Sequence, residues 1–295
     1  NWAIEGQAVG SQTVPLEGPD RTGSVIAARL SREGRGFDFS TGYFQVSPDF
    51  RTDLGFVRRR DIREIESEAD YTWHFEKGSV QNFGLGLEGS AIWNFAGDLE
   101  EWTLEPGGEV QLAGQTEIGV RHWNIFERFQ DTDFRRQSTV VYASTEWLSW
   151  LGLNGSTEWG TAINYYPAEG IEPFLAASVE AEAGFTFKPI PPLRLDQSYL
   201  YTKLDLRHQE GACPRCAGSR IFSNHILRTR ASYQFTRELS ARVIVDYESV
   251  LPNATLVDLE EERRLGYDLL VTYLVNPWTA VYVGYTDRYE NWMLD

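Results

Sequence analysis

The chain of 295 residues lacks any run that approaches the roughly 18 to 20 consecutive apolar residues a membrane helix requires. A membrane helix is therefore excluded, and any membrane embedding must be by a closed β-barrel, which satisfies every backbone polar group between its strands. The mean hydropathy of -0.38 and the net charge of -16 would suit a soluble acidic protein equally well. Composition alone does not decide between these two classes.

Groups typical of catalysis are also few. The chain has four histidines, and they are scattered along it. No Gly-x-Ser-x-Gly elbow, His-Glu-x-x-His helix or phosphate-binding loop occurs. The sequence therefore predicts a protein that is not an enzyme and has no cofactor and no metal site, although a His–Ser pair formed in space would escape such a search. The acidic balance also argues against a nucleic-acid partner, because nucleic-acid binders present basic stripes.

The chain has two cysteines, Cys213 and Cys216, in a Cys-Pro-Arg-Cys segment. A single Cys-x-x-Cys pair is weak evidence for a metal site. His208 and His225 could complete a zinc site, but their spacing matches no common zinc finger. A thioredoxin-like redox role lacks its βαβ context. In an oxidising exterior, a local disulfide that pins a long loop is the favoured interpretation.

What the chain does contain is a two-residue alternation that returns in segment after segment. In residues 83–95 the odd positions are mostly apolar, and Glu88 lies in the other phase. In residues 175–187 the apolar positions alternate with polar ones that include Glu180 and Glu182. Because successive side chains of a strand point to opposite faces, each segment presents one apolar face and one charged face. A lipid-facing exterior and a watery lumen require that arrangement.

The polar phase carries charges of both signs, which a dry sandwich core could not hold without partners. We expect these side chains to face the lumen of a barrel. The expected lumen-facing charged residues are Glu88, Glu109, Glu117, Arg121, Glu180, Glu182, Arg228, Arg230, Arg242 and Asp246.

Fifteen segments show the pattern, and short turns alternate with longer polar loops between them. Short joints such as Pro106-Gly107-Gly108 fall at every second connection, and longer connections such as 122–136 take the other parity, with the brief Ala96-Gly97 joint as the exception. Outer-membrane barrels keep short turns on the periplasmic side and long loops outside. The expected strands are 2–10, 23–33, 36–46, 61–75, 79–95, 98–105, 109–121, 137–148, 151–164, 173–188, 193–207, 221–235, 238–249, 264–275 and 279–289.

The pattern predicts an all-β fold, a transmembrane antiparallel up-and-down β-barrel of about 16 strands. We expect residues 1–295 to form a single barrel domain. Fifteen strands leave Asp295 on the outside, and bacterial single-chain barrels are usually even, so the closing strand is expected to be missing. The start at Asn1 shows no secretory signal, which indicates a mature or partial chain.

Two segments carry a resemblance to a known family. Residues 42–61 read GYFQVSPDFRTDLGFVRRRD, and residues 227–245 include YQFTRELSARV. Both segments resemble an uncharacterised bacterial family whose members place a carbohydrate-binding-module family 9-like domain ahead of a large outer-membrane barrel. The resemblance implies a bacterial outer-membrane location and a barrel, and it implies no activity. It covers most of the chain but not the N-terminal module, so glycan binding by that module is not expected of these residues.

The first of these segments ends in a run of charged residues, Arg58, Arg59, Arg60 and Asp61. A bare arginine in lipid costs about 2 to 4 kcal/mol at the midplane, so the run belongs in a loop or at a strand end. It is expected to fold inward against Glu64, Glu66 and Glu68. The functional interpretation is a lumenal constriction that sorts solutes by charge. A structural ladder of arginines and carboxylates is the alternative, and it is favoured.

The leading interpretation of function is a porin-like channel for small solutes with a charged lumen, because a barrel of this size is wide enough for water. One alternative is a non-conducting anchor or scaffold, in which the same charges cross-pair and the barrel binds partner proteins or surface glycans. A surface hydrolase is a second alternative. The expected partners are outer-membrane lipid and lipopolysaccharide, together with other envelope proteins.

Overall fold

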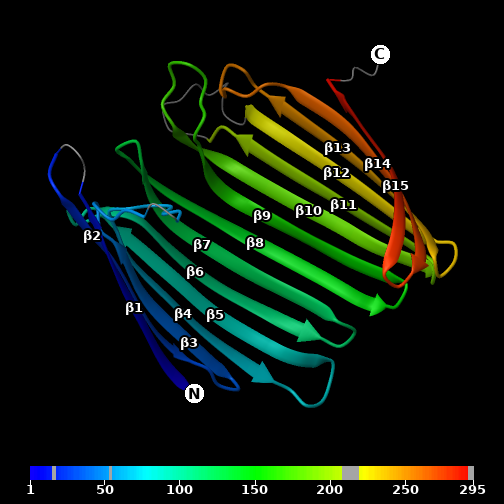
Figure 1. Ribbon diagram of the computed structural model, residues 1–295, viewed down its shortest axis with the longest axis horizontal. Helices are drawn as coiled ribbons and strands as arrows, with labels where there is room; N and C mark the ends of the chain where they lie inside the picture. Colours follow the sequence, from blue (N-terminus) through cyan, green and yellow to red (C-terminus); the bar gives the residue numbers. More distant parts are fainter. Residues whose placement is uncertain (15–17, 53–54, 208–218, 292–295) are drawn as a thin grey trace. The chain divides into compact units, whose positions relative to one another are not determined.

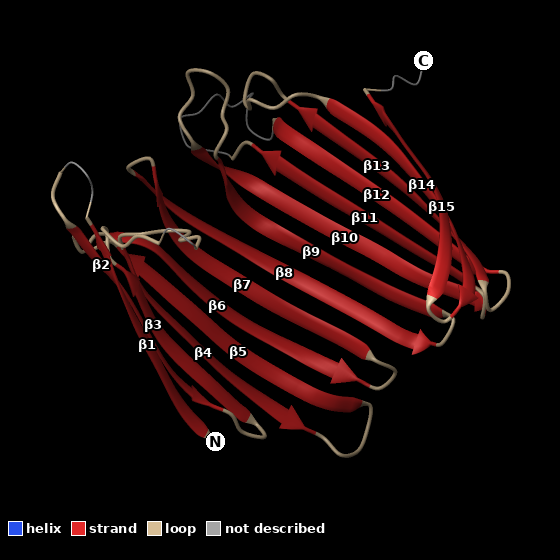
Figure 2. Ribbon diagram, viewed as in Figure 1, coloured by secondary structure: helices blue, strands red, loops and turns tan. Residues whose placement is uncertain are grey.

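The fold consists of β-strands joined by turns and loops (Figure 2). It is known from a computed structural model that describes residues 1–14, 18–52, 55–207 and 219–291. Within these ranges no helix is long and apolar enough to cross a membrane.

The strands follow one another along the chain and are labelled in Figure 1. Their bounds are β1 Trp2–Thr13, β2 Arg21–Arg32, β3 Phe37–Val46, β4 Ile62–His74, β5 Val80–Trp93, β6 Leu99–Leu112, β7 Thr116–Phe129, β8 Thr132–Leu148, β9 Leu151–Asn164, β10 Phe174–Ile190, β11 Leu193–Asp205, β12 Arg220–Gln234, β13 Leu239–Pro252, β14 Glu262–Asn276 and β15 Thr279–Glu290.

Each strand pairs with the next in the chain, so the order in the 15-stranded sheet is the order of the sequence. The registers from β1 to β5 and from β8 to β15 are antiparallel throughout. The predicted all-β, antiparallel, up-and-down class is therefore confirmed. The described residues hold the fifteen strands read from the sequence, where a barrel of about 16 was predicted.

By their internal contacts the residues form two compact units, each described by itself below. Unit 1 comprises Asn1–Val110 and Val120–Gln137, and unit 2 comprises Gln111–Gly119 and Ser138–Asp295. In unit 2 the tight turns lie at one end of the strands and the longer connections at the other (Figure 1). In unit 1 the long β1–β2 and β3–β4 connections share their end of the strands with the short β5–β6 connection and the two-residue β7–β8 turn, and the β2–β3 and β4–β5 turns lie at the other end. These ends are called the turn end and the loop end. The expectation of a single domain stays a prediction.

The expected strand boundaries are wrong around β6 to β8. Pro106-Gly107-Gly108, expected as a turn, lies inside β6, and the expected loop 122–136 is largely strand. A Cβ on Gly107 would lie 3.2 Å from Arg121 Cγ, and one on Gly108 would lie 3.0 Å from Leu85 Cδ2. The two glycines therefore leave room for side chains of neighbouring strands and do not reverse the chain.

The actual connections on either side of β7 are short: three residues, 113–115, lie between β6 and β7, and two, 130–131, lie between β7 and β8. Gly114 and Gln115 have φ values of 75° and 53°, and Gln130 and Asp131 have φ values of 49° and 62°. Positive φ at both central residues is the geometry of a type I′ hairpin turn. Asn-Gly and Asp-Gly are the usual sequences for such a turn, and the Gln130-Asp131 pair carries no such signal.

The registers assign residues to two faces of the sheet, because directly paired residues of antiparallel strands share a face. In unit 2 one transverse row across β11 to β14 is Ser198, Arg228, Asp246 and Gly266. The row beside it, on the opposite face, is Tyr199, Leu227, Tyr247 and Leu265. We call the first the polar face and the second the apolar face.

Unit 1 divides its residues in the same way. Across β3, β4 and β5, Ser40, Glu68 and Glu88 share the polar face, and Phe37, Tyr71 and Leu85 share the apolar face. The alternation predicted from the sequence therefore holds in the paired strands of both units.

Candidate functional site

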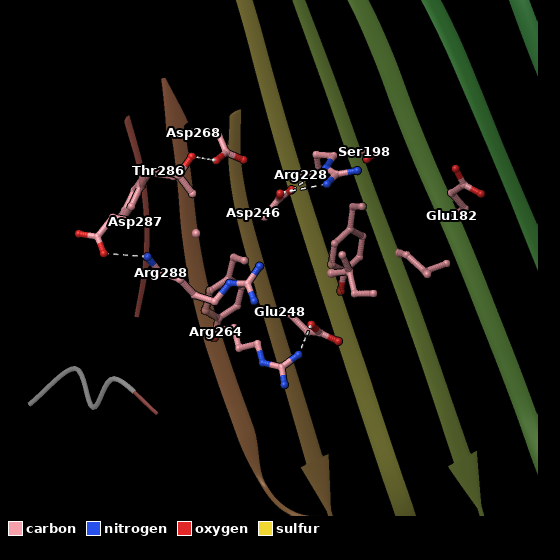
Figure 3. A pocket seen from close by; sticks show the side chains of 16 residues that line it. Glu182, Ser198, Arg228, Asp246, Glu248, Arg264, Asp268, Thr286, Asp287 and Arg288 are labelled. Carbon is pink, nitrogen blue, oxygen red and sulfur yellow. Dashed lines mark hydrogen bonds and ion pairs between the residues drawn. The ribbon is translucent and has the colours of Figure 1, made fainter. Parts of the chain in front are cut away.

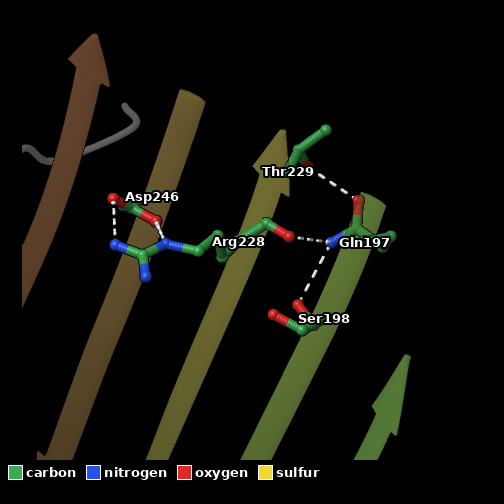
Figure 4. Close-up of polar contacts among 5 residues, drawn as sticks. All are labelled: Gln197, Ser198, Arg228, Thr229 and Asp246. Atoms are coloured by element: carbon green, nitrogen blue, oxygen red, sulfur yellow. Dashed lines mark hydrogen bonds and ion pairs between the residues drawn. The ribbon is translucent and has the colours of Figure 1, made fainter. Parts of the chain in front are cut away.

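The polar face of unit 2 is crossed by paired charges. Arg228 of β12 lies directly opposite Asp246 of β13. Its Nε and Nη2 atoms donate to the two carboxylate oxygens of Asp246 at 2.6 and 3.0 Å (Figure 4). Such a bidentate pair fixes both side chains against the wall of the sheet.

This pair borders a hollow of about 470 Å³ on the polar face (Figure 3). Towards the loop end, Arg264 Nη1 of β14 lies 3.7 Å from Glu248 Oε2 of β13. Arg264 also forms an ion pair with Glu262 of its own strand. Asp268 accepts a hydrogen bond of 2.7 Å from Thr286 Oγ1 of β15. The hollow is therefore walled by charges of both signs that β12 to β15 supply.

A second hollow, of about 340 Å³, lies at the turn end of β11 to β14. Three arginines contribute to its lining, Arg194 of β11, Arg230 of β12 and Arg242 of β13. Arg194 Nε donates to Asp196 at 2.9 Å. The rest of the lining is partly polar and partly apolar, and consists of Ser232, Gln234, Ser240, Thr272, Pro191, Pro192, Tyr233, Ala241 and Leu270.

The polar face of unit 1 is dominated by carboxylates. Asp38 of β3 lies directly opposite Asp70 of β4, and Glu68 of β4 lies directly opposite Glu88 of β5. Like charges directly opposite each other destabilise a sheet. This wall therefore presents a negative surface to whatever lies in front of it.

At the loop end of unit 1 the connection between β3 and β4 folds back over the polar face. Phe50 packs against Val46 and Ile62, which are buried and belong to the polar face by register. The backbone N–H of Arg51 donates to Ser11 Oγ of β1 at 3.1 Å. A Cβ on Gly23 of β2 would lie 2.1 Å from Phe50 Cα, so this close approach requires glycine.

In unit 2 the connection between β13 and β14 also folds back over the polar face. Val257 is buried against Ala176 of β10 and Leu204 of β11, both on the polar face. Asn164 Nδ2 of β9 donates to the carbonyl oxygen of Leu256 at 3.0 Å. Both connections therefore fold over the charged face at the loop end.

The structure places the expected charged residues as follows. Glu180, Glu182, Arg228, Arg230, Arg242 and Asp246 share one face of β10, β12 and β13. Among them, Arg228 and Asp246 form an ion pair. Glu88 lies on the polar face of unit 1, and Arg121 Nε lies 3.8 Å from Glu105. Glu109 lies in β6 and Glu117 in β7.

The arginine run lies between β3 and β4, outside any strand. Arg59 pairs with Glu100 of β6. Asp61 Oδ1 accepts a hydrogen bond of 2.9 Å from the backbone N–H of Phe95. Cys213 and Cys216 lie outside the described residues, so the expected disulfide stays a prediction. Across the described ranges no group of three or more His, Cys, Asp and Glu residues could hold a metal ion.

Sequence reasoning missed several residues of the polar face. Arg194, Asp196, Arg264 and Asp268 all share it. Their phase in β11 and β14 is readable from the alternation, but their pairing across strands depends on the register. Asp196 and Arg230, for example, are direct neighbours only because β11 pairs with β12 in this register.

No protein-family model matches the chain, and no curated protein matches it. Among solved structures, the NanC porin has 10% sequence identity and a TM-score of 0.31, covering 72% of this chain and 94% of that one. The outer membrane channel DcaP of Acinetobacter baumannii has 10% identity and a TM-score of 0.45, covering 97% and 95%.

A mutant of the ferric enterobactin receptor PfeA from Pseudomonas aeruginosa has 8% identity and a TM-score of 0.48. The match covers 96% of this chain and 52% of the receptor chain. At such identities and scores, the activities of these proteins are not transferred to this chain.

Proposed function

We propose that the protein is a porin-like channel of the bacterial outer membrane, with the apolar face against lipid and the polar face lining a lumen for small solutes. One observation carries the proposal: the same strands expose large apolar side chains on one face and charges on the other. Leu227, Val243 and Leu269, on the apolar face, are 40%, 39% and 42% exposed. Lipid would cover this apolar surface, and water in a lumen would solvate the charges.

Strand length and the pattern of connections support the proposal. Outer-membrane strands need about 9 to 11 residues to cross at a tilt. β10 has 17 residues and β12 has 15. In unit 2 the tight turns are segregated from the longer connections, which is the arrangement of outer-membrane barrels, with the loops outside. Outer-membrane lipid and lipopolysaccharide are then the partners of the apolar face.

A non-conducting anchor that binds envelope proteins is the second candidate, and two observations favour it. The Arg228–Asp246 pair and the Arg264–Glu248 pair hold charges against the wall and against each other. The two inward-folded connections cover part of the polar face at the loop end. If such contacts filled the lumen, the barrel would not conduct.

Conductance of the purified, detergent-folded chain in a planar bilayer tests both candidates. The channel proposal predicts steady current, with a reversal potential in a salt gradient that reports the preferred ion sign. Neutralising Glu68→Gln should move the reversal potential towards anions, because it removes a negative charge from the polar face. Glu33→Gln, between β2 and β3, is the matched control and should not move it. Folded, heat-modifiable protein without current would overturn the channel in favour of the anchor.

A further inference from the structure

Three arginines surround one serine at the turn end of unit 2. Ser232 of β12 lies directly opposite Arg194 of β11 on one side and Arg242 of β13 on the other. Arg230 is two residues from Ser232 on the same strand and shares its face. Neighbouring strands lie about 4.8 Å apart and two residues span about 6.7 Å, so all three arginines are within side-chain reach of the space above Ser232.

That space is the hollow of about 340 Å³ at the turn end. Its lining is rich in hydrogen-bond donors, because Ser232, Ser240 and Thr272 contribute hydroxyls beside the three guanidinium groups. Ser240 and Thr272 are directly paired across β13 and β14 on the polar face. Donor side chains therefore form the polar part of the lining, and Pro191, Pro192, Ala241 and Leu270 form its apolar part.

The arginines here are less neutralised than those of the neighbouring hollow. Arg194 is bonded to Asp196, and that carboxylate also accepts a hydrogen bond of 2.7 Å from Thr186. In the part of the chain that the structure describes, Arg230 and Arg242 have no carboxylate within 4.0 Å. Arg228, one position further along the polar face of β12, is held by Asp246 instead.

Three carboxylates lie around the hollow, and among the described residues none of them lies within 4.0 Å of Arg230 or Arg242. Asp196 lies directly opposite Arg230, and Asp268 shares the same transverse row two strands away. Glu146 lies near Arg194. Asp196 and Asp268 already accept hydrogen bonds from threonine hydroxyls. Arg230 acts on Asp196 through charge, but among the described residues neither Arg230 nor Arg242 forms an ion pair with a carboxylate. Their N–H donors are therefore available to a ligand in the hollow.

We propose that this hollow binds a small oxyanion, a carboxylate or phosphate group of a solute, at the turn end of the polar face. Guanidinium groups present fixed pairs of N–H donors that match carboxylate and phosphate oxygens. Rings of arginine select anions in pores by the same chemistry. The assignment to a transported solute rests on the proposed channel function, whereas the binding itself does not.

Isothermal titration calorimetry on the detergent-folded full chain tests the binding. Inorganic phosphate and succinate are titrated separately at low salt, which distinguishes phosphorylated from carboxylated solutes. The double variant Arg230→Gln and Arg242→Gln should weaken binding about tenfold or more, because it removes two charge-assisted donors. Arg237→Gln, in the turn between β12 and β13, is the matched control and should leave the affinity unchanged. Equal binding by the double variant, or no binding by the native chain, would overturn the site.

A second variant and a second readout keep the outcomes separate. Ser232→Asp places a carboxylate among the three arginines and should abolish binding, because this carboxylate repels an anion and accepts the N–H donors that the anion would use. Heat-modifiable mobility on a gel confirms that each variant is folded. A chain that conducts but binds neither anion overturns the site and leaves the channel intact. A chain that binds the anions through these arginines but carries no current overturns the channel and leaves the site intact.

Discussion

A glutamine and a threonine meet on the apolar face of unit 2, between large apolar side chains (Figure 4). Thr229 Oγ1 donates to Gln197 Oε1 at 2.7 Å. Gln197 Nε2 donates to the carbonyl oxygens of Arg228 at 2.9 Å and Ser198 at 3.2 Å. Each polar group of the two side chains is therefore bonded, as a surface against lipid requires.

Thr229→Val is expected to destabilise the folded chain by about 1 to 3 kcal/mol, because it leaves the Gln197 carbonyl oxygen without a donor. Adding Gln197→Leu to it should restore most of that loss, because no polar group is then left unpaired. Urea unfolding of vesicle-inserted protein measures both variants. A Thr229→Val chain as stable as the native one would show that the side-chain bond does not stabilise the strand pair.

A charge pair closes the hairpin between β7 and β8. Arg128 Nε donates to Asp133 Oδ1 at 2.8 Å, across the Gln130-Asp131 turn. This hydrogen bond from Arg128 holds the pKa of the Asp133 carboxyl below its usual range. β8 has 17 residues, more than the roughly 9 to 11 that cross a membrane, so Asp133 at its loop end lies outside the apolar segment.

Arg128→Gln should raise the pKa of Asp133 towards its ordinary value. The pKa is lowered in the folded chain, so the pair contributes stability above the unfolded pKa and loses it as the pH falls through the folded pKa. Carbon-13 NMR titration of the aspartate carboxyl carbons measures the shift. Arg135→Gln is the control: Arg135 acts on Asp133 through charge alone, so the rise should be smaller. An unchanged pKa in Arg128→Gln would contradict this account of the pair.

At the scale of elements, the connection between β3 and β4 lies over the polar face, and its backbone at Phe50 packs directly against the backbone of β2 at Gly23. Gly23 lies against Phe50, and any larger residue at position 23 would overlap the Phe50 backbone. Phe50 is 7% exposed. The connection therefore keeps its place through this approach and through the small cluster with Val46 and Ile62.

Gly23→Ala should displace this connection from the polar face and open the loop end of unit 1. Trypsin should then cut faster after Arg51 or in the run of Arg58 to Arg60. In a conducting channel, the single-channel conductance should also rise. Gly10→Ala on the neighbouring β1 is the matched control, since a Cβ there would meet nothing within 4 Å. Equal cleavage of Gly23→Ala and the native chain would show that the contact does not hold the loop.

The sequence predicted most strands correctly because alternation acts within a strand and needs no partner. It failed at β6 to β8, where composition and geometry disagree. Pro106-Gly107-Gly108 has the composition of a turn, yet its glycines make room for Arg121 and Leu85 of the adjacent strands. Local patterns contain no information about side chains that arrive from neighbouring strands.

The candidate site was predictable to the same extent. The phase of Arg228, Arg230, Arg242 and Asp246 is readable from their own strands, and the structure puts all four on one face. The pairing of Arg228 with Asp246, and the placement of Arg194 beside Ser232, depend on registers that turn lengths and bulges set. The inward folding of the connections had no signal in the alternation.

At the scale of the whole molecule, the two faces of the sheet differ in polarity, and this difference indicates which environment each face suits. Both units place carboxylates and arginines on one face and apolar and aromatic side chains on the other. The exposed apolar residues include Leu85, Leu87, Val141, Leu153 and Tyr273, from both units. A soluble protein rarely leaves so large an apolar surface uncovered. The net charge of -16 then belongs mainly to the polar face, the loops and the turns.

Two adjacent residues at the middle of β12 test this division. Leu227 lies on the apolar face and Ile226 on the polar face, beside Glu248. If lipid covers the apolar face, Leu227→Arg should destabilise the vesicle-inserted chain by about 2 to 4 kcal/mol, the cost of arginine at the bilayer midplane. Ile226→Arg should cost far less, because it points into water next to a carboxylate. If water covered both faces, Leu227→Arg would change stability by no more than about 0.5 kcal/mol, as exposed substitutions do. The difference between the two variants in urea unfolding thus measures which face meets the membrane, and a difference near zero would contradict the proposed membrane embedding.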